Sequence, residues 1–149
     1  MDGKIAAYRH ADTMGKSQID LILMVYDGAI KALRDATNHY SKNENDAGYE
    51  QLQHAKRFIT HLYTTLDMSR GGEVAENLSK MYVWTISQLF VVEASKDVDE
   101  LGSVTKVMEN LRFAWAEIKE QQDGDVPVVS QTDEVTEIPE LNEEFVTTG

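Results

Sequence analysis

The longest apolar segment of the chain lies between Ser17 and Leu33, and its spacing predicts a helix. Seven of the eight residues from 19 to 26 are apolar, and Asp20 is the exception. Steps of three and four residues align one stripe: Ile19, Ile22, Leu23, Tyr26, Ile30 and Leu33. A second face holds Leu21, Met24, Val25, Gly28, Ala29 and Ala32. Because a helix that is apolar most of the way round must be covered on several sides, this one is either the centre of a bundle or keeps a face for a partner.

The ends of this helix carry recognisable signals. Ser17 is a predicted N-cap, and Asp20 stands three residues later, as in a capping box. Residues 41–48 have turn composition throughout, so the helix is expected to end there.

Three further helices follow from the same kind of spacing. The second is predicted from about Asp46 to Met68, where the glycines of residues 69–72 would stop it. The third starts near Glu73 and is apolar on more than one side, and the fourth ends near Gln122 with Trp115 on its buried stripe. Long helices with short connections are typical of an antiparallel four-helix bundle, so we expect an all-α domain over residues 17–122.

The two ends of the chain differ from this domain. Residues 1–16 have no sustained period, although Ile5 and Tyr8 can share one side of a helical turn, which predicts a flexible N-terminal arm. Residues 123–149 hold eight acidic side chains and no lysine or arginine, and their composition predicts a disordered acidic tail. Within that tail, residues 138–145 are a candidate docking motif.

Charge and composition exclude several functions. The net charge is −12, but residues 1–122 hold 18 acidic against 14 basic side chains, so the acidity sits in the tail. Such a balance argues against binding to nucleic acid. The absence of cysteine excludes disulfides and thiolate metal sites. No signal peptide and no apolar run of about 18 residues is visible, so a cytoplasmic protein without membrane contact is expected.

Histidines are the remaining candidates for chemistry. His54 and His61 are seven residues apart, about 10 Å along a helix, and cannot chelate one metal ion alone. No cofactor site is expected. The alternative function is a histidine phosphotransfer domain with His54 as acceptor, exposed beside Lys56 and Arg57, whose cations would steady a phosphoryl group. In such domains a glycine usually follows the histidine and leaves room for the incoming phosphate, whereas Phe58 and Ile59 stand there in this chain.

Several stretches resemble the signature motifs of one protein family. Residues 21–30 (LILMVYDGAI) are similar to the family's apolar run ending in Leu-Tyr-Asp-Gly-Ala. Residues 66–78 match its Gly-Gly-Glu-Ile-Ala segment, residues 81–82 its Leu-Tyr, and residues 114–115 its late Ala-Trp. Ile5 and Tyr8 resemble its N-terminal Ile-x-x-Tyr element. The likeness runs in order over about residues 5–120, so the chain resembles the flagellar secretion chaperones of the FliS family.

This resemblance implies a non-enzymatic export chaperone in the cytoplasm, monomeric or weakly dimeric. Such a protein binds the disordered C-terminal segment of flagellin in apolar grooves, prevents premature polymerisation and delivers it to the flagellar export gate. An anti-sigma factor is an additional partner in some family members. The expected partner-binding residues are Ile5, Tyr8, Ile22, Tyr26, Asp27, Gly28, Ile30, Leu33, Tyr82, Trp84 and Phe90.

Structural roles compete with this assignment at several positions. Spacing alone favours the core for Ile22, Tyr26, Ile30 and Leu33. Gly28 is explained equally by a close helix crossing or by backbone access for a partner. A third possibility for the whole chain is a plain assembly bundle without a client, which predicts that no apolar surface remains exposed.

Overall fold

The computed structural model describes residues 17–121, which form four helices. Helix α2 spans Gln18–Ser41, α3 spans Asn45–Thr64, α4 spans Met68–Ser95 and α5 spans Val98–Gln121. The bundle expected from the sequence is therefore confirmed. The predicted arm with Ile5 and Tyr8, and the predicted tail, lie outside the described residues. None of the four helices is long and apolar enough to cross a membrane.

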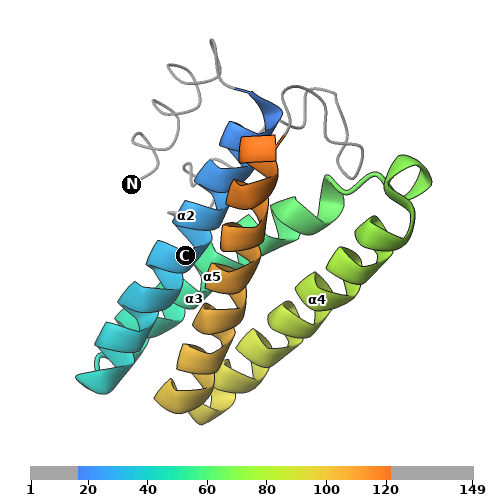
Figure 1. Ribbon diagram of the computed structural model, residues 1–149. Coiled ribbons are helices and arrows are strands. Elements are labelled where there is room, and N and C mark those ends of the chain that lie inside the picture. Colours follow the sequence, from blue (N-terminus) through green and yellow to red (C-terminus); the bar gives the residue numbers. More distant parts are fainter. Residues whose placement is uncertain (1–16, 122–149) are drawn as a thin grey trace.

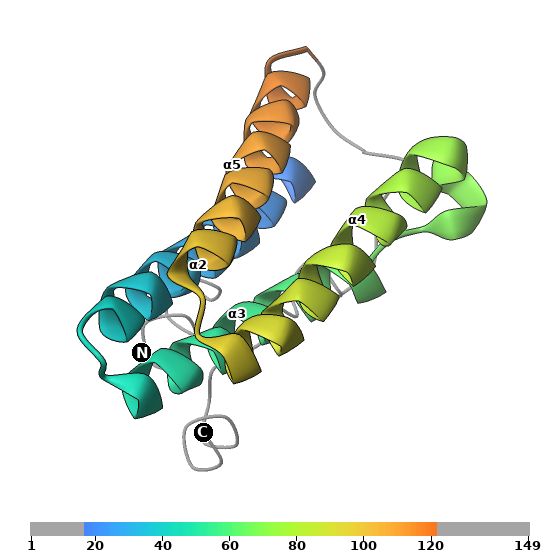
Figure 2. The same ribbon diagram turned by 90° about the horizontal axis from the view of Figure 1, so that it is seen from below.

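Short turns make neighbouring helices antiparallel, and α2 packs between α3 and α5 (Figure 1). Helix α4 completes the bundle opposite α2, and Figure 2 shows it beside α3. Twelve of the 24 residues of α2 are buried, against five of the 28 in α4. Of the two alternatives for the first helix, the structure therefore supports the central member of a bundle.

The predicted start of α2 is confirmed in detail. Ser17 Oγ accepts a hydrogen bond from the backbone N–H of Asp20 at 3.1 Å. The Asp20 carboxylate accepts from the Ser17 N–H at 3.3 Å, which completes a capping box. Lys119 Nζ also lies 2.5 Å from this carboxylate, and these contacts hold the pKa of Asp20 below its usual value.

The boundary between the second and third helices was predicted only in part. Helix α3 ends at Thr64 instead of Met68, and α4 begins with a short helical turn at Met68 that was not predicted. The reason is Asp67, whose carboxylate accepts the backbone N–H groups of Ser69 and Arg70 and so caps a new helix. Gly72, with φ 57° and ψ −135°, interrupts α4 after one turn and does not close α3. The long part of α4 follows the non-helical Gly72 and so starts near Glu73, as predicted.

A series of ion pairs marks the register between α2 and α5. Asp20 pairs with Lys119, Asp27 with Arg112, and Arg34 with Glu109. The three α2 positions are spaced by seven residues, which keeps them on one edge of the helix. Because such pairs are partly exposed, they contribute little stability, but they agree with only one antiparallel alignment.

Candidate partner-binding surface

The apolar surface of the described residues is concentrated on α4. Ten large apolar side chains are exposed, and seven belong to this helix: Met68, Val74, Met81, Val83, Trp84, Phe90 and Val91. Its buried side holds Ala75, Tyr82, Thr85, Leu89 and Val92. The assembly-bundle alternative predicted no exposed apolar surface, and that prediction is wrong.

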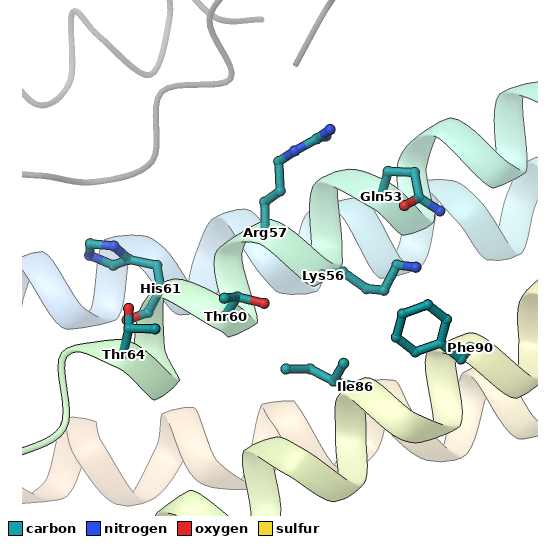
Figure 3. A pocket seen from close by; sticks show the side chains of 8 residues that line it. All are labelled: Gln53, Lys56, Arg57, Thr60, His61, Thr64, Ile86 and Phe90. Atoms are coloured by element: carbon teal, nitrogen blue, oxygen red, sulfur yellow. The ribbon is translucent and has the colours of Figure 1, made fainter. Parts of the chain in front are cut away.

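Part of this surface borders a groove between α3 and α4 (Figure 3). The groove has a volume of about 550 Å³ and is lined by Gln53, Lys56, Arg57, Thr60, His61, Thr64, Ile86 and Phe90. Helix α3 supplies the six polar residues, and α4 supplies the two apolar ones. In Figure 3, the Lys56 side chain extends from α3 toward Phe90, whereas Arg57 extends away from α4. One wall is therefore polar with cationic groups, and the other is apolar.

Lys56 connects the two walls. Its Nζ lies 3.8 Å from the centroid of the Phe90 ring, a cation–π contact. The same ammonium group pairs with the carboxylate of Glu93, which also accepts a hydrogen bond from Gln53 Nε2 at 2.9 Å. The ammonium group is largely buried, because the Lys56 side chain is only 12% exposed. These contacts orient the ring of Phe90, which is 57% exposed, at the edge of the groove.

The structure divides the predicted partner-binding residues into two groups. Trp84 and Phe90 are 41% and 57% exposed on α4 and are accessible to a partner. The apolar α2 positions Ile22, Ile30 and Leu33 are buried in the core. For these three, partner contact stays a prediction, and in this conformation they present almost no surface.

Tyr26 and Tyr82 lie even deeper, at 0% and 1% exposure. Their hydroxyl oxygens are 2.6 Å apart, and Trp115 Nε1–H donates to the Tyr26 oxygen at 3.1 Å. Burial, the largest cause, raises the pKa of Tyr26 well above its ordinary value and that of Tyr82 to about 12. Both phenols therefore stay neutral near pH 7 and link α2, α4 and α5 inside the bundle. The predicted core position of Trp115 is confirmed.

Asp27 and Gly28 have structural roles toward two different neighbours of α2: Asp27 contacts α5, and Gly28 contacts α3. Asp27 accepts hydrogen bonds from Arg112 Nε at 2.5 Å and Nη2 at 3.3 Å. A Cβ atom at position 28 would lie 2.6 Å from Cζ of Phe58. Gly28 is thus where the Phe58 ring of α3 packs against the α2 backbone, which supports the close-crossing interpretation.

The prediction that His54 is exposed is wrong. This side chain is only 5% exposed, because it lies on the inner face of α3 with Ala55 and Phe58. A phosphate acceptor must be reachable by the phosphodonor, so the geometry gives the phosphotransfer alternative no support.

Most of the groove was not predicted from the sequence. Phe90 is the one predicted partner-binding residue among the described residues that line it, and Lys56 and Arg57 had been considered only in the phosphotransfer alternative. One sequence feature could have indicated the groove. Ile86 and Phe90 are four residues apart, and they lie next to the core stripe of the third helix without belonging to it. Ile5 and Tyr8 lie outside the described residues.

Comparison with known proteins gives one consistent family. The family model for the flagellar protein FliS matches residues 1–122. The flagellar secretion chaperone FliS of Salmonella typhimurium is 33% identical over 106 residues, which is 70% of this chain and 78% of the relative. The proteins of the same name from Escherichia coli and Vibrio cholerae are 29% and 25% identical. Those matches cover 70% and 79% of this chain and 77% and 90% of the relatives.

Proposed function

Because this chain belongs to the FliS family of flagellar proteins, we propose that it is a secretion chaperone whose client binds the apolar surface of α4 and the adjoining α3–α4 groove. The observation that carries this proposal is the placement of Phe90. Its ring is 57% exposed, yet Lys56 holds it at the edge of a groove of about 550 Å³.

The chemistry of the surface suits a peptide segment. Recognition of an amphipathic helix requires an apolar groove for its anchors and polar groups beside that groove for orientation. Ile86 and Phe90 supply the apolar part, and Lys56 and Thr60 supply the polar part. Val83 and Trp84 extend the apolar surface along α4. A disordered client loses conformational entropy on binding, so an extended contact area is needed to offset that loss.

The client we propose is the C-terminal segment of flagellin, bound in the cytoplasm before export. Segments that pack into a filament carry apolar helix faces, and an uncovered face of this kind promotes association. Covering those faces would keep flagellin unpolymerised until it reaches the export gate. Ile5 and Tyr8 remain candidates for an arm that covers the groove before the client arrives.

Calorimetric titration of the full chain with a peptide from the C-terminus of the host's flagellin tests this proposal. One-to-one binding with a negative heat-capacity change is expected, because apolar surface is buried. Replacing Phe90 by alanine should weaken binding by about 1–2 kcal/mol, or roughly five- to thirtyfold. Phe113→Ala is the matched control, since Phe113 is 65% exposed on α5 and does not line the groove.

Two results would contradict the proposal. Absence of binding by calorimetry and by an independent method would remove flagellin as the client. Equal losses in the Phe90→Ala and Phe113→Ala variants would remove the α3–α4 groove as the binding site.

A further inference from the structure

The lining of the groove restricts what it can accept. Ile86 and Phe90 form its apolar wall, and none of the described residues that line it carries a carboxylate. The positive charge of Lys56 is balanced by Glu93, and the Arg57 side chain extends away from α4 (Figure 3). The groove therefore favours a segment that offers apolar side chains and has no cationic side chain, since a cation would find no carboxylate in this lining.

The chain itself contains such a segment. Residues 123–149 hold eight acidic side chains and no lysine or arginine. Within them, residues 138–145 (IPELNEEF) place Ile138, Leu141 and Phe145 at steps of three and four, with glutamates between them. This segment thus offers apolar side chains at helical spacing to the apolar wall of the groove, and it contains no lysine or arginine.

Gln121, the last described residue, lies at the end of the bundle from which the tail can reach the groove. Lys119, near the end of α5, pairs with Asp20 at the start of α2. Because α2 and α3 are antiparallel, the end of α3, with His61 and Thr64, lies at the same end of the bundle. Residues 122–138 can span up to about 55 Å when extended, whereas the 20 residues of α3 cover only about 30 Å.

We propose that residues 138–145 dock in the α3–α4 groove of their own chain and compete there with the client. The competition rests on the function proposed above, whereas the docking does not. A tether of this kind gives an effective concentration of about 1 mM. A contact with an intrinsic Kd of about 0.1 mM would then occupy the groove about 90% of the time and weaken client binding about tenfold. A weak contact is therefore enough to regulate the chaperone.

Docking is tested by paramagnetic relaxation in the full-length protein. The chain has no cysteine, so Thr147→Cys provides a single attachment site for a nitroxide label. We expect selective loss of NMR signal at Thr60, Thr64 and Ile86, compared with residues around Arg112 on the α2–α5 face. Combining Leu141→Ser with Phe145→Ser should restore those signals. The control is Val128→Ser with Val129→Ser, which removes two apolar side chains outside the docking segment and should leave the signal loss intact.

Three results would overturn docking within the chain. The first is equal signal loss at the groove and around Arg112. The second is loss that persists in the Leu141→Ser, Phe145→Ser variant. The third is the same loss in isotope-enriched protein without the nitroxide when it is mixed with spin-labelled protein of natural isotopic abundance, since the occupant would then come from another molecule.

Competition is measured separately, by titrating the flagellin peptide into the same unlabelled variants. The Leu141→Ser, Phe145→Ser variant should bind it about tenfold more tightly than the natural chain, and the Val128→Ser, Val129→Ser control should not. Equal affinities would overturn the competition. If the peptide binds none of the variants, the proposed function fails together with the competition, and the relaxation measurement alone decides the docking.

Discussion

The hydroxyl oxygens of Tyr26 and Tyr82 lie 2.6 Å apart in the interior and join α2 to α4 across the bundle. Trp115 on α5 donates its indole N–H to the Tyr26 oxygen at 3.1 Å, so three helices share one polar network. All three side chains are at most 3% exposed, and solvent cannot replace a lost partner. Since an unsatisfied buried polar group is costly, the network favours one arrangement of these helices.

Replacing Tyr26 by phenylalanine should therefore destabilise the protein. The change leaves the Trp115 N–H and the Tyr82 hydroxyl without their partner, at a cost of about 1–3 kcal/mol. Urea unfolding followed by circular dichroism measures the effect. Tyr49→Phe is the control, because Tyr49 is 48% exposed, and it should change the free energy of unfolding by less than about 0.5 kcal/mol. Similar changes for both variants would contradict a structural role for the network.

The same phenols predict a loss of stability at alkaline pH. The pKa of Tyr82 is about 12 in the folded protein, raised by burial from 10.0. Because the unfolded chain gives up this proton first, the contribution of Tyr82 is complete below pH 10 and is lost as the pH rises from 10 to 12. The two pKa units correspond to roughly 3 kcal/mol.

Thermal unfolding between pH 8 and pH 12 measures this dependence. The melting temperature should fall above pH 10. The tyrosinate absorbance of Tyr26 and Tyr82 should appear only as the protein unfolds. The Tyr82→Phe variant should show a shallower fall, starting from a lower melting temperature. An equally steep fall in that variant would show that other groups cause the alkaline loss.

Gly28 is predicted to resist substitution although it lies inside a helix. Alanine is favoured over glycine there by about 1 kcal/mol on helix propensity. A Cβ atom would, however, lie 2.6 Å from Cζ of Phe58, and overpacking of this kind costs about 1–3 kcal/mol. We expect Gly28→Ala to destabilise the protein in urea unfolding.

A matched control lies on α5. Gly102 is also helical, and a Cβ there would meet nothing within 4 Å, so Gly102→Ala should stabilise the protein by up to about 1 kcal/mol. Adding Phe58→Leu to Gly28→Ala should recover part of the loss, because the smaller side chain leaves room. If both glycine variants were stabilised, the crossing at Gly28 would not be tightly packed.

The sequence allowed the four helices to be predicted because each carries a stripe at steps of three and four residues. It also indicated that the third helix is apolar on more than one side. Within this helix, Tyr82 and Leu89 are buried, whereas Val74 and Met81 are exposed, so spacing alone does not separate the buried side from the exposed one. The cap at Asp67 was missed because an aspartate two residues before a serine is common, and the glycines at positions 71 and 72 are a stronger stop signal.

The groove could not be predicted from one sequence. Lys56 and Glu93 are 37 residues apart, and their meeting depends on how far α3 and α4 are displaced along each other. Helical periodicity gives the faces of each helix but not this register. The burial of His54 was missed for a related reason. His54 lies on the buried side of α3 with Ala55 and Phe58, and the charged neighbours Lys56 and Arg57 obscured that side in the sequence.

The two aromatic residues Tyr26 and Phe90 should affect partner binding in different ways. Tyr26 has no exposed surface, so Tyr26→Ala removes a core side chain and should cost about 3–5 kcal/mol of stability. Phe90→Ala removes an exposed ring and should leave the melting temperature nearly unchanged. If the α3–α4 groove binds the client, both variants weaken binding. Only the loss of affinity in Tyr26→Ala should increase with the fraction of the protein that is unfolded.

Titration of each variant with the flagellin peptide at several temperatures separates the two causes. The binding defect of Tyr26→Ala should diminish on cooling to the temperature at which the variant is fully folded, since only the competent fraction binds. The defect of Phe90→Ala should persist at every temperature, because the missing contact area is absent from the folded protein. A Tyr26→Ala defect that persists in the fully folded variant would mean that the client reaches the interior, and the bundle would then have to open for binding.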